Sequence, residues 1–352
     1  MNVLRRINDY IGRKARLAFI WVIRILFAKP HMKVPFWKRI WYAFSGGYIA
    51  DQIALYNINH KTKKEYLSEF DWYKSRYMNG NYKFILNNKI VSTEILKQYV
   101  YVPAIYALKQ KKVISDFDNN GIDSPERIVE LLKKQKKLFL KPIDRGKGIG
   151  VLCLKYEKNK YYVNEELSSK EDILKLLNEK NNYFISEAIE QNKYLNDLYD
   201  KTSNTLRLVV FKDPETEKFI LYFGVQRIGT AKTIPVDNGS QGGLIAKVDL
   251  ETGELSAAKS LHNLNVYDVH PDSKKPIKGV VIPNWKNIKN EILDLSNHMP
   301  YLNFIAWDVL LTDKGMCIIE ANTSSGVNVL QLWGGQKNQK LGDLFRYHKV
   351  IK

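Results

Sequence analysis

The pattern of hydrophobic and polar positions changes character near the middle of the chain. Before Leu138 the apolar residues recur mostly at helical spacing, as in the charged segment 125–137, and the run 98–108 is interpreted in the same way. From Leu138 onward, short runs rich in β-branched and aromatic residues alternate with turn residues, which is typical of strands. The expected strands cover 138–141, 151–154, 161–163, 183–186, 206–211, 219–226, 305–311 and 316–320.

These elements predict an α+β protein with largely antiparallel sheets behind a helical N-terminal segment. Helices are expected at 170–178 and 287–297, and the pairs Asp213–Pro214 and Lys314–Gly315 mark hairpin turns. The chain has 352 residues, and single cores stop growing near about 250–300 residues, so several lobes are expected. The predicted divisions are 1–75, a basic helical region; 76–136, a first lobe; 137–190, a small lobe with a glycine-rich loop; and 191–352, a C-terminal lobe.

The N-terminal region combines a short apolar segment with a strong positive charge. Residues 17–28 are apolar except for Arg24, but a spanning helix needs about 20 apolar residues, so a membrane span is not predicted. A secretory leader is disfavoured because Arg24 interrupts the apolar run and Lys29–Pro30 stands where small residues should mark cleavage. Two interpretations stay open: a helix at an anionic membrane interface, formed by residues 1–40, or an ordinary buried helix.

Charge and cysteine content restrict the class of partner and the compartment. The net charge is +18, and residues 1–50 contribute ten Lys or Arg against one acidic residue, which favours acidic partners. No nucleic-acid readout motif is found, so nucleic acid is not the predicted partner. The two cysteines, Cys153 and Cys317, lie in apolar runs without metal-site spacing, which favours reduced core residues in a cytoplasmic protein, with the inner face of the membrane as the peripheral alternative.

A first candidate site follows the strand that ends at Lys141. Its lysine precedes a loop that contains Gly146, Gly148 and Gly150 together with further cations. Glycines let backbone N–H groups approach phosphate oxygens, and the cations offset their charge, so the loop suits a polyphosphate. The spacing differs from that of a P-loop or a dinucleotide fingerprint. A plain tight turn is the structural alternative.

A second candidate site lies near the C-terminal end of the chain. The segment 305–322 reads as two strands with a turn at 313–315, a hairpin that brings Asp308 near Glu320, with Asn322 on the same side as Glu320. Carboxylate and amide oxygens are ligands that Mg²⁺ accepts, while phosphates and water complete its octahedron. Acids bounded by apolar neighbours are costly to bury without a cation, so a magnesium site is favoured over a solvated strand end.

The order of these motifs resembles the ATP-grasp superfamily. The resemblance rests on Lys141 in an L-K-P strand end, the glycine-rich hairpin, Ser186-Glu187-Ala188 and the late Asp308…Glu320-x-Asn322 set. Further motifs are similar to sugar-transfer-associated ATP-grasp proteins and to their teichuronopeptide-biosynthesis relatives. They are S-N-T-L-R ending at Arg207, P-V-D-N-G-S-Q-G-G at 235–243, H-P-D at 270–272, I-P-x-W at 282–285 and W-D-V at 307–309. The similarity spans roughly residues 75–335.

The resemblance implies ATP and Mg²⁺ as cofactors held between two α+β lobes with antiparallel sheets. It implies that Lys141 and Lys89 bind the ATP phosphates, although Lys89 also reads as a surface lysine. The implied adenine contacts are Glu187 with the backbone of Ala188 and Ile189, and Glu190 is the candidate for the ribose. Gly146 and Gly148 belong to the implied phosphate loop, and Asp308, Glu320 and Asn322 match the magnesium ligands.

Two arginines are the catalytic candidates beside Lys141. Arg207 and Arg227 lie on predicted strands of one lobe, where guanidinium groups bind a phosphate or a developing oxyanion. Many ATP-grasp ligases carry an arginine two positions before the first metal aspartate, and here that position is Ala306. Arg207 is therefore the expected stabiliser of an acyl phosphate.

A polar loop and one histidine complete the candidate residues. The loop supplies Asp237, Asn238, Gly242 and Gly243 as substrate residues, with a plain turn as the alternative. His270 is a candidate general base or a satisfied loop histidine.

The predicted function is a carboxylate–amine ligase that acts through an acyl phosphate on a bacterial cell-surface polysaccharide or its precursor. The expected substrate is a small molecule or glycan, and it is anionic because the surface is basic. Two alternatives stay open: a sugar kinase that uses the same ATP apparatus, and a non-catalytic scaffold at the membrane.

Overall fold

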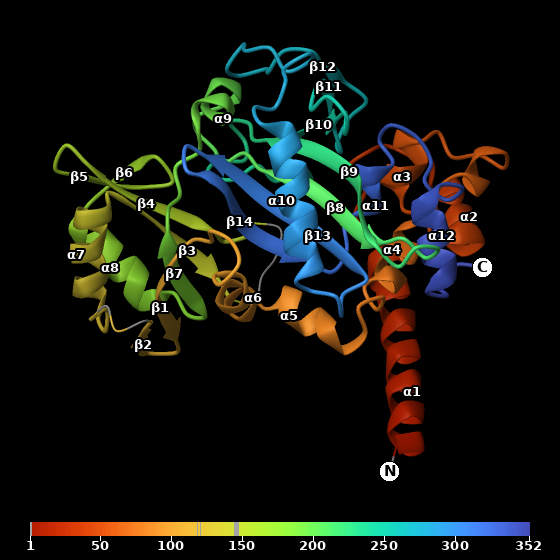
Figure 1. Ribbon diagram of the computed structural model, residues 1–352, viewed down its shortest axis with the longest axis horizontal. Coiled ribbons are helices and arrows are strands. Elements are labelled where there is room, and N and C mark those ends of the chain that lie inside the picture. The colour runs from red at the N-terminus through yellow and green to blue at the C-terminus, as the bar shows by residue number, and fades with distance from the viewer. Residues whose placement is uncertain (1, 118, 120, 144–147) are drawn as a thin grey trace.

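The computed structural model consists of two seven-stranded sheets with helices on their faces and a long N-terminal helix that extends from the body (Figure 1). The structure describes residues 2–117, 119, 121–143 and 148–352, without the side chains of residues 2–9. The mixed α and β composition with antiparallel sheets and a helical N-terminal segment was predicted.

The first sheet has the strand order β2-β1-β7-β3-β4-β5-β6, and every pairing in it is antiparallel. Its strands are β1 (Ile105–Gln110), β2 (Val113–Asp116), β3 (Lys137–Pro142), β4 (Leu152–Glu157), β5 (Lys160–Val163), β6 (Glu166–Ser168) and β7 (Tyr183–Glu187). Helices α7 (Pro125–Gln135) and α8 (Lys170–Glu179) pack together and share its core. Each begins at a serine whose hydroxyl accepts a backbone N–H of the first turn, which fixes where the helix starts.

The second sheet has the order β12-β11-β10-β9-β8-β13-β14. Its strands are β8 (Leu206–Lys212), β9 (Phe219–Ile228), β10 (Leu244–Val248), β11 (Leu255–Ser260), β12 (Val266–Tyr267), β13 (Phe304–Thr312) and β14 (Gly315–Asn322). Helix α9 (Lys193–Leu198) precedes β8, and a 3₁₀ turn, η4 (Gly239–Gln241), lies between β9 and β10.

Alternation along the central strands divides the second lobe into two cores. On β8, Leu208 and Val210 join one core, whereas Val209 and Phe211 join the other, because strand side chains alternate between faces. Helix α10 (Trp285–Asn297) covers the first face, and α4 (Glu69–Ser75), α11 (Val327–Leu330) and α12 (Lys340–Tyr347) contribute to the second. Both faces of the central strands are therefore buried, which holds the strand ends rigidly.

Besides α4, further helices fill the N-terminal quarter of the chain. They are α1 (Asn2–Ile20), the π-helical segment η1 (Trp21–Leu26), α2 (Phe36–Gly46), α3 (Ala50–Leu55), η2 (Thr62–Lys64), η3 (Gly80–Tyr82), α5 (Lys83–Asn87) and α6 (Lys89–Leu96). Helices α5 and α6 pack against β14, so this quarter is joined to the second sheet. Within the described part of the chain, no helix has both the length and the apolar character needed to span a bilayer.

The helical interpretation of residues 98–108 is wrong. The chain turns after α6 and forms strand β1, which pairs with β7 and β2. Pro103 cannot donate the hydrogen bond that a helix interior requires, and buried and exposed positions alternate from Ile105 to Gln110. Strands β1 and β2 of the first sheet therefore lie in a segment that was predicted to form helices and turns.

Candidate active site

Charged side chains form a row across four neighbouring strands of the second sheet. The register places Asp308 of β13 opposite Arg207 of β8 and, on its other side, opposite Glu320 of β14. On β9, Val225 lies opposite Arg207, and Arg227 follows two residues later on the same face. Two hairpins far apart in sequence, β8–β9 and β13–β14, thus bring basic and acidic groups to one end of the sheet.

A β-bulge decides which face carries the residues of β14. The pairing shifts between Asp308 and Val309, so Ile319 is an extra residue on β14. In a regular ladder, Ile319 would lie opposite Asp308, and Glu320 would point to the other face. The bulge therefore places Glu320, and Asn322 two residues later, on the same face as Asp308.

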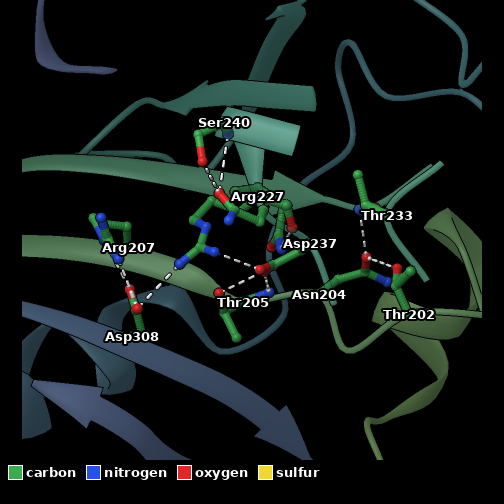
Figure 2. A network of polar contacts seen from close by, with 12 residues as sticks. Thr202, Asn204, Thr205, Arg207, Arg227, Thr233, Asp237, Ser240 and Asp308 are labelled. Atoms are coloured by element: carbon green, nitrogen blue, oxygen red, sulfur yellow. Dashed lines mark hydrogen bonds and ion pairs between the residues drawn. The ribbon is translucent and has the colours of Figure 1, made fainter. Parts of the chain in front are cut away.

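Ion pairs join this row to the loop after β9 (Figure 2). Arg207 donates through Nε and Nη2 to the two oxygens of Asp308, at 2.7 and 2.6 Å, and Arg227 Nη1 donates to the same carboxylate at 3.0 Å. The Nη2 of Arg227 donates to Asp237 at 2.6 Å. The backbone N–H and the hydroxyl of Thr205 both donate to the second oxygen of Asp237, each at 2.6 Å.

Burial makes these pairs electrostatically strong. Only 5% of the Asp308 side chain and 17% of the Arg207 side chain are exposed. Burial by itself raises the pKa of Asp308, but Arg207 and Arg227 outweigh it and hold the pKa below its usual range. For Asp237 the effect of burial prevails over Arg227 and raises the pKa. Asp308 is thus the firmly ionised member of the network.

Two lysines from outside the second sheet face the acidic end of this row. Burial and the charge of Lys89 together lower the pKa of Lys141, on β3, to about 8, although Cys317 and Glu320 act in the opposite direction. Lys89 is the first residue of α6, which packs against β14. Lys141 therefore lies near both Lys89 and Glu320, which suits an arrangement around a polyphosphate.

The donor set fits a magnesium ion in ligand type. Glu320 has no hydrogen bond or ion pair with a described residue, and the buried amide nitrogen of Asn322 has no partner among them. Asp308 offers about four acceptor positions, of which the arginines use three. In the described part of the chain, no three His, Cys, Asp or Glu side chains form a metal cluster, and the predicted set combines two carboxylates with the carboxamide oxygen of Asn322.

The connection between the two sheets runs beside Glu187. Its carboxylate accepts the backbone N–H of Ala104 at 3.2 Å and the hydroxyl of Tyr101 at 3.3 Å. The backbone of Tyr101 also forms an isolated β-bridge with Cys317 on β14. Ala188, Ile189 and Glu190 follow directly at this junction, in a segment without regular structure. The adenine role predicted for 187–190 stays a prediction, but the segment lies where the two lobes meet.

The glycine-rich loop and the polar loop lie against each other. A Cβ at Gly148, where φ is +65°, would come within 2.9 Å of the side chain of Val236. A Cβ at Gly243 would come within 2.7 Å of the backbone oxygen of Asp237, so only glycine fits there. Gly146 lies outside the described residues. The predicted phosphate loop therefore meets the predicted substrate loop, which also holds Gly242.

Asn238 and His270 have local structural partners. Asn238 accepts the backbone N–H and the hydroxyl of Ser240, at 3.0 and 2.9 Å. The ring of His270 is fully buried, and its Nδ1 lies 3.2 and 3.1 Å from the backbone N–H groups of Asp272 and Ser273. Its Nε2 lies 2.8 Å from the carbonyl of Gly229. These contacts favour the satisfied loop histidine over the general base, so His270 is left out of the proposed catalytic set.

Two residues of the network were not predicted. Thr205 anchors Asp237, and Tyr101 contacts Glu187, yet neither was assigned a role. Thr205 belongs to the motif that ends at Arg207. It lies two residues before that arginine, and this strand spacing could have predicted that both side chains share one face. Tyr101 was missed because residues 98–108 were interpreted as a helix.

Comparison with known proteins decides the family. The sequence model of the family described as "Sugar-transfer associated ATP-grasp" matches residues 69–341, more than three quarters of the chain. The chain is a member of the sugar-transfer associated ATP-grasp family. The matched range includes the whole charged row, both lysines and the loops that meet at Gly148. Among curated proteins no sequence matches this chain.

Solved structures of ATP-grasp ligases resemble this family member. The ligase PsnB, "complexed with phosphomimetic variant of minimal precursor, Mg, and ADP", is 10% identical, with a TM-score of 0.39, 78% of this chain covered and 61% of that chain. The VanG D-Ala:D-Ser ligase from Enterococcus faecalis is 13% identical, with a TM-score of 0.43 and coverage of 75% and 62%. D-alanyl-alanine synthetase A from Vibrio cholerae is 11% identical, with a TM-score of 0.43 and coverage of 76% and 66%. The chain thus spans about three fifths to two thirds of the length of these proteins.

Proposed function

We propose that this ATP-grasp protein is an ATP- and Mg²⁺-dependent ligase that joins a carboxylate to an amine through an acyl phosphate. The observation that carries the proposal is the charged row Glu320–Asp308–Arg207–Arg227, which faces Lys141 and Lys89. Acids on one side and lysines on the other suit a metal-bound triphosphate, whose transfer needs positioning and neutralised charge and no protein nucleophile.

The two lysines would bind phosphate oxygens. Lys141 is half-buried, so its charge acts in a medium less polar than bulk water and is stronger toward a phosphate. Asp308, Glu320 and Asn322 would hold a magnesium ion, which when bound neutralises phosphoryl charge. Their position on one face, opposite the lysines, leaves the phosphates between the two groups.

The arginines would act on the substrate carboxylate and on the charge that develops from it. In the proposed reaction a carboxylate oxygen forms a bond to the γ-phosphorus, the bond to the β-phosphate oxygen breaks and ADP leaves. The amine then attacks the acyl carbon, orthophosphate leaves, and the amine releases a proton. Arg207 is the better placed stabiliser because its Nη1 makes no hydrogen bond with a described residue, whereas Arg227 is engaged by two carboxylates.

We infer that the substrate is a saccharide or polysaccharide precursor that carries a carboxylate, joined to an amino acid. The family is named for its association with sugar transfer, and the net charge of +18 suits an anionic glycan. The loop 235–243 would contact this substrate, because it adjoins both Arg227 and the glycine-rich loop.

The test is the set of products formed from ATP, Mg²⁺, candidate uronic acids and amino acids. A ligase gives ADP, orthophosphate and an amide product whose mass equals the sum of both substrates minus water. ADP with a phosphorylated sugar identifies the kinase instead. No ATP consumption with any pair, together with no calorimetric signal for Mg²⁺-dependent nucleotide binding, identifies the non-catalytic scaffold and refutes the proposal.

A further inference from the structure

Helix α2 presents an aromatic face that is largely exposed. Trp37, Trp41 and Phe44 recur at the spacing i, i+4, i+7, so they lie on one side of the helix. They are 79%, 55% and 68% exposed. The ring of Trp21, at the start of η1, meets Phe44 edge-on with ring centroids 4.9 Å apart, which extends the aromatic face from α2 to η1.

The preceding helix is not part of a core. From residue 10 to residue 20 of α1, Leu17 is the buried apolar side chain, whereas Phe19 is 68% exposed. Phe27, directly after η1, is 71% exposed. Figure 1 shows α1 extending away from the body of the protein. The prediction of an ordinary buried helix therefore does not describe this segment, and the interfacial alternative gains support.

Basic side chains gather beside this aromatic face. Arg76 is exposed at its surface, and desolvation together with the nearby Arg16 and Arg24 lowers its pKa, although Tyr73 and Glu69 act against this shift. Burial and the nearby Arg16 and Arg13 lower the pKa of Lys83. Helix α4, which immediately precedes Arg76, packs on both α1 and η1, and η1 packs on α2, so the basic group adjoins the aromatic face.

Three of these cations lie over aromatic rings, and Glu69 is a carboxylate that acts on Arg76. Arg13 and Lys83 each lie over the ring of Tyr77, at 4.3 and 4.4 Å from its centroid, and Arg76 lies 4.2 Å from the ring of Trp72. Between residues 10 and 50 the sequence contains eight Lys or Arg and no Asp or Glu. None of these eight forms an ion pair with a carboxylate of a described residue. Among the described residues the group therefore carries an excess of positive charge.

We propose that the aromatic face of α2 and η1, together with the basic group Arg13, Arg16, Arg24, Arg76 and Lys83, docks on the surface of an anionic lipid bilayer. This surface is called the docking surface below. The tryptophan rings enter the interfacial layer, where an amphipathic ring is favoured, and the cations contact lipid phosphates. The docking surface lies on the N-terminal helices, outside the charged row and both of its lysines.

Charge complementarity favours a bilayer over a second copy of this chain. Another copy carries the same net charge of +18 and the same unneutralised cations, so two such surfaces repel. An anionic bilayer supplies phosphates at high density together with an apolar layer for the rings. An anionic bilayer therefore binds both the cations and the aromatic rings of the docking surface.

Co-sedimentation of the full-length chain with lipid vesicles tests this proposal. Vesicles of phosphatidylcholine and phosphatidylglycerol should bind the protein, and vesicles of phosphatidylcholine alone should bind it at least tenfold more weakly. Arg16→Gln with Arg24→Gln, both at exposed positions, should weaken binding at least about tenfold, since each cation near the surface typically contributes roughly fivefold. Trp37→Ser with Trp41→Ser should reduce binding as strongly, and high salt should weaken binding of the parent protein.

Matched variants elsewhere separate docking from general charge and hydrophobicity. Lys134→Gln with Lys175→Gln removes the same charge from α7 and α8, and Leu167→Ser with Leu264→Ser removes exposed apolar groups of the other regions. Both should leave vesicle binding within about twofold of the parent value. Equal binding to neutral and anionic vesicles, or equal losses in the control variants, overturns the proposal. A dimer seen by light scattering that Trp37→Ser with Trp41→Ser dissociates, without vesicle binding, assigns the surface to a second copy and overturns it as well.

Discussion

Two groups of arginines in this protein differ in how their charge is neutralised. Arg207 and Arg227 are mostly buried and reach Asp308 and Asp237 at 2.6–3.0 Å. Arg16 and Arg24 are exposed and lie close to Arg76, without an ion pair to a carboxylate of a described residue. The first group is neutralised by ion pairs inside the fold, whereas the second group forms no ion pair with a described carboxylate and is accessible to an external anion. Removing a charged side chain should therefore lower the free energy of unfolding in the first group and leave it unchanged or slightly higher in the second.

The largest expected effect comes from removing the charge that the buried arginines share. Asp308→Asn leaves Arg207 and Arg227 with a neutral partner, and breaking a buried ion pair costs about 3–5 kcal/mol. We expect a loss of about 3 kcal/mol in the free energy of unfolding, measured by urea denaturation, and no measurable ATP turnover.

Glu320→Gln is the matched control for this prediction. Glu320 lies opposite Asp308 but has no hydrogen bond or ion pair with a described residue, so its loss should change stability by less than about 0.5 kcal/mol. Turnover should still be abolished if the residue holds magnesium. Equal destabilisation by both variants would contradict the ion-pair account, and full activity of both would contradict the metal assignment.

A smaller effect is expected at the lysine that faces the row. Lys141→Ala should raise the apparent dissociation constant for ATP at least tenfold, which corresponds to about 1.4 kcal/mol. The reason is the loss of a half-buried positive charge near Lys89 and Glu320. Isothermal titration calorimetry with Mg·ATP measures the constant, and an unchanged value would remove Lys141 from the nucleotide site.

The lowered pKa of Lys141 predicts a pH dependence of nucleotide binding. Its pKa of about 8 in the free protein means that the proton is lost as pH rises through 8, and a bound phosphate favours the protonated form. ATP affinity should therefore be highest below pH 8 and should fall several-fold between pH 8 and pH 9.5. Lys141→Arg keeps its charge over this range, so its titration curve should be flatter; identical curves for the two proteins would contradict the assignment.

The smallest expected effect is the change in the free energy of unfolding when Arg16 and Arg24 are replaced. Arg16→Gln with Arg24→Gln should change the free energy of unfolding by less than about 0.5 kcal/mol, or raise it slightly, because repulsion with Arg76 is relieved. Thermal and urea denaturation measure this value. A loss comparable to that of Asp308→Asn would show that the charge of this group is neutralised within the fold, and the contrast between the two groups would no longer hold.

Much of the second sheet and its site followed from local sequence. The runs of β-branched residues predicted β8, β9, β13 and β14 within a few residues, because alternation and turn residues are local signals. The hairpin at Asp313–Gly315 predicted that Asp308 and Glu320 would meet, and the register places them opposite each other. Their binding of a metal stays a prediction, since contact between side chains does not identify a ligand.

Other parts could not be read from local signals. Strand β1 was predicted as helix, because a short apolar run near Pro103 fits both periods until its partners β7 and β2 are known. The partners of the arginines were also not predicted. The sequence offered Arg207 and Arg227 as phosphate or oxyanion ligands, whereas the fold pairs both with Asp308 and one with Asp237.

The sequence by itself determined the kinds of groups present: two lysines, a late pair of acids with an asparagine, a glycine-rich loop and a basic, aromatic N-terminal segment. Tertiary structure alone decided which of these charges form ion pairs with one another and which remain exposed to solvent. The reason is that Coulomb interactions depend on distance and burial, and both are set by strand register, by the bulge at Ile319 and by the packing of α4 on α1 and η1. Residue type is local, but the surroundings that give a charge its role are assembled from segments far apart in the chain.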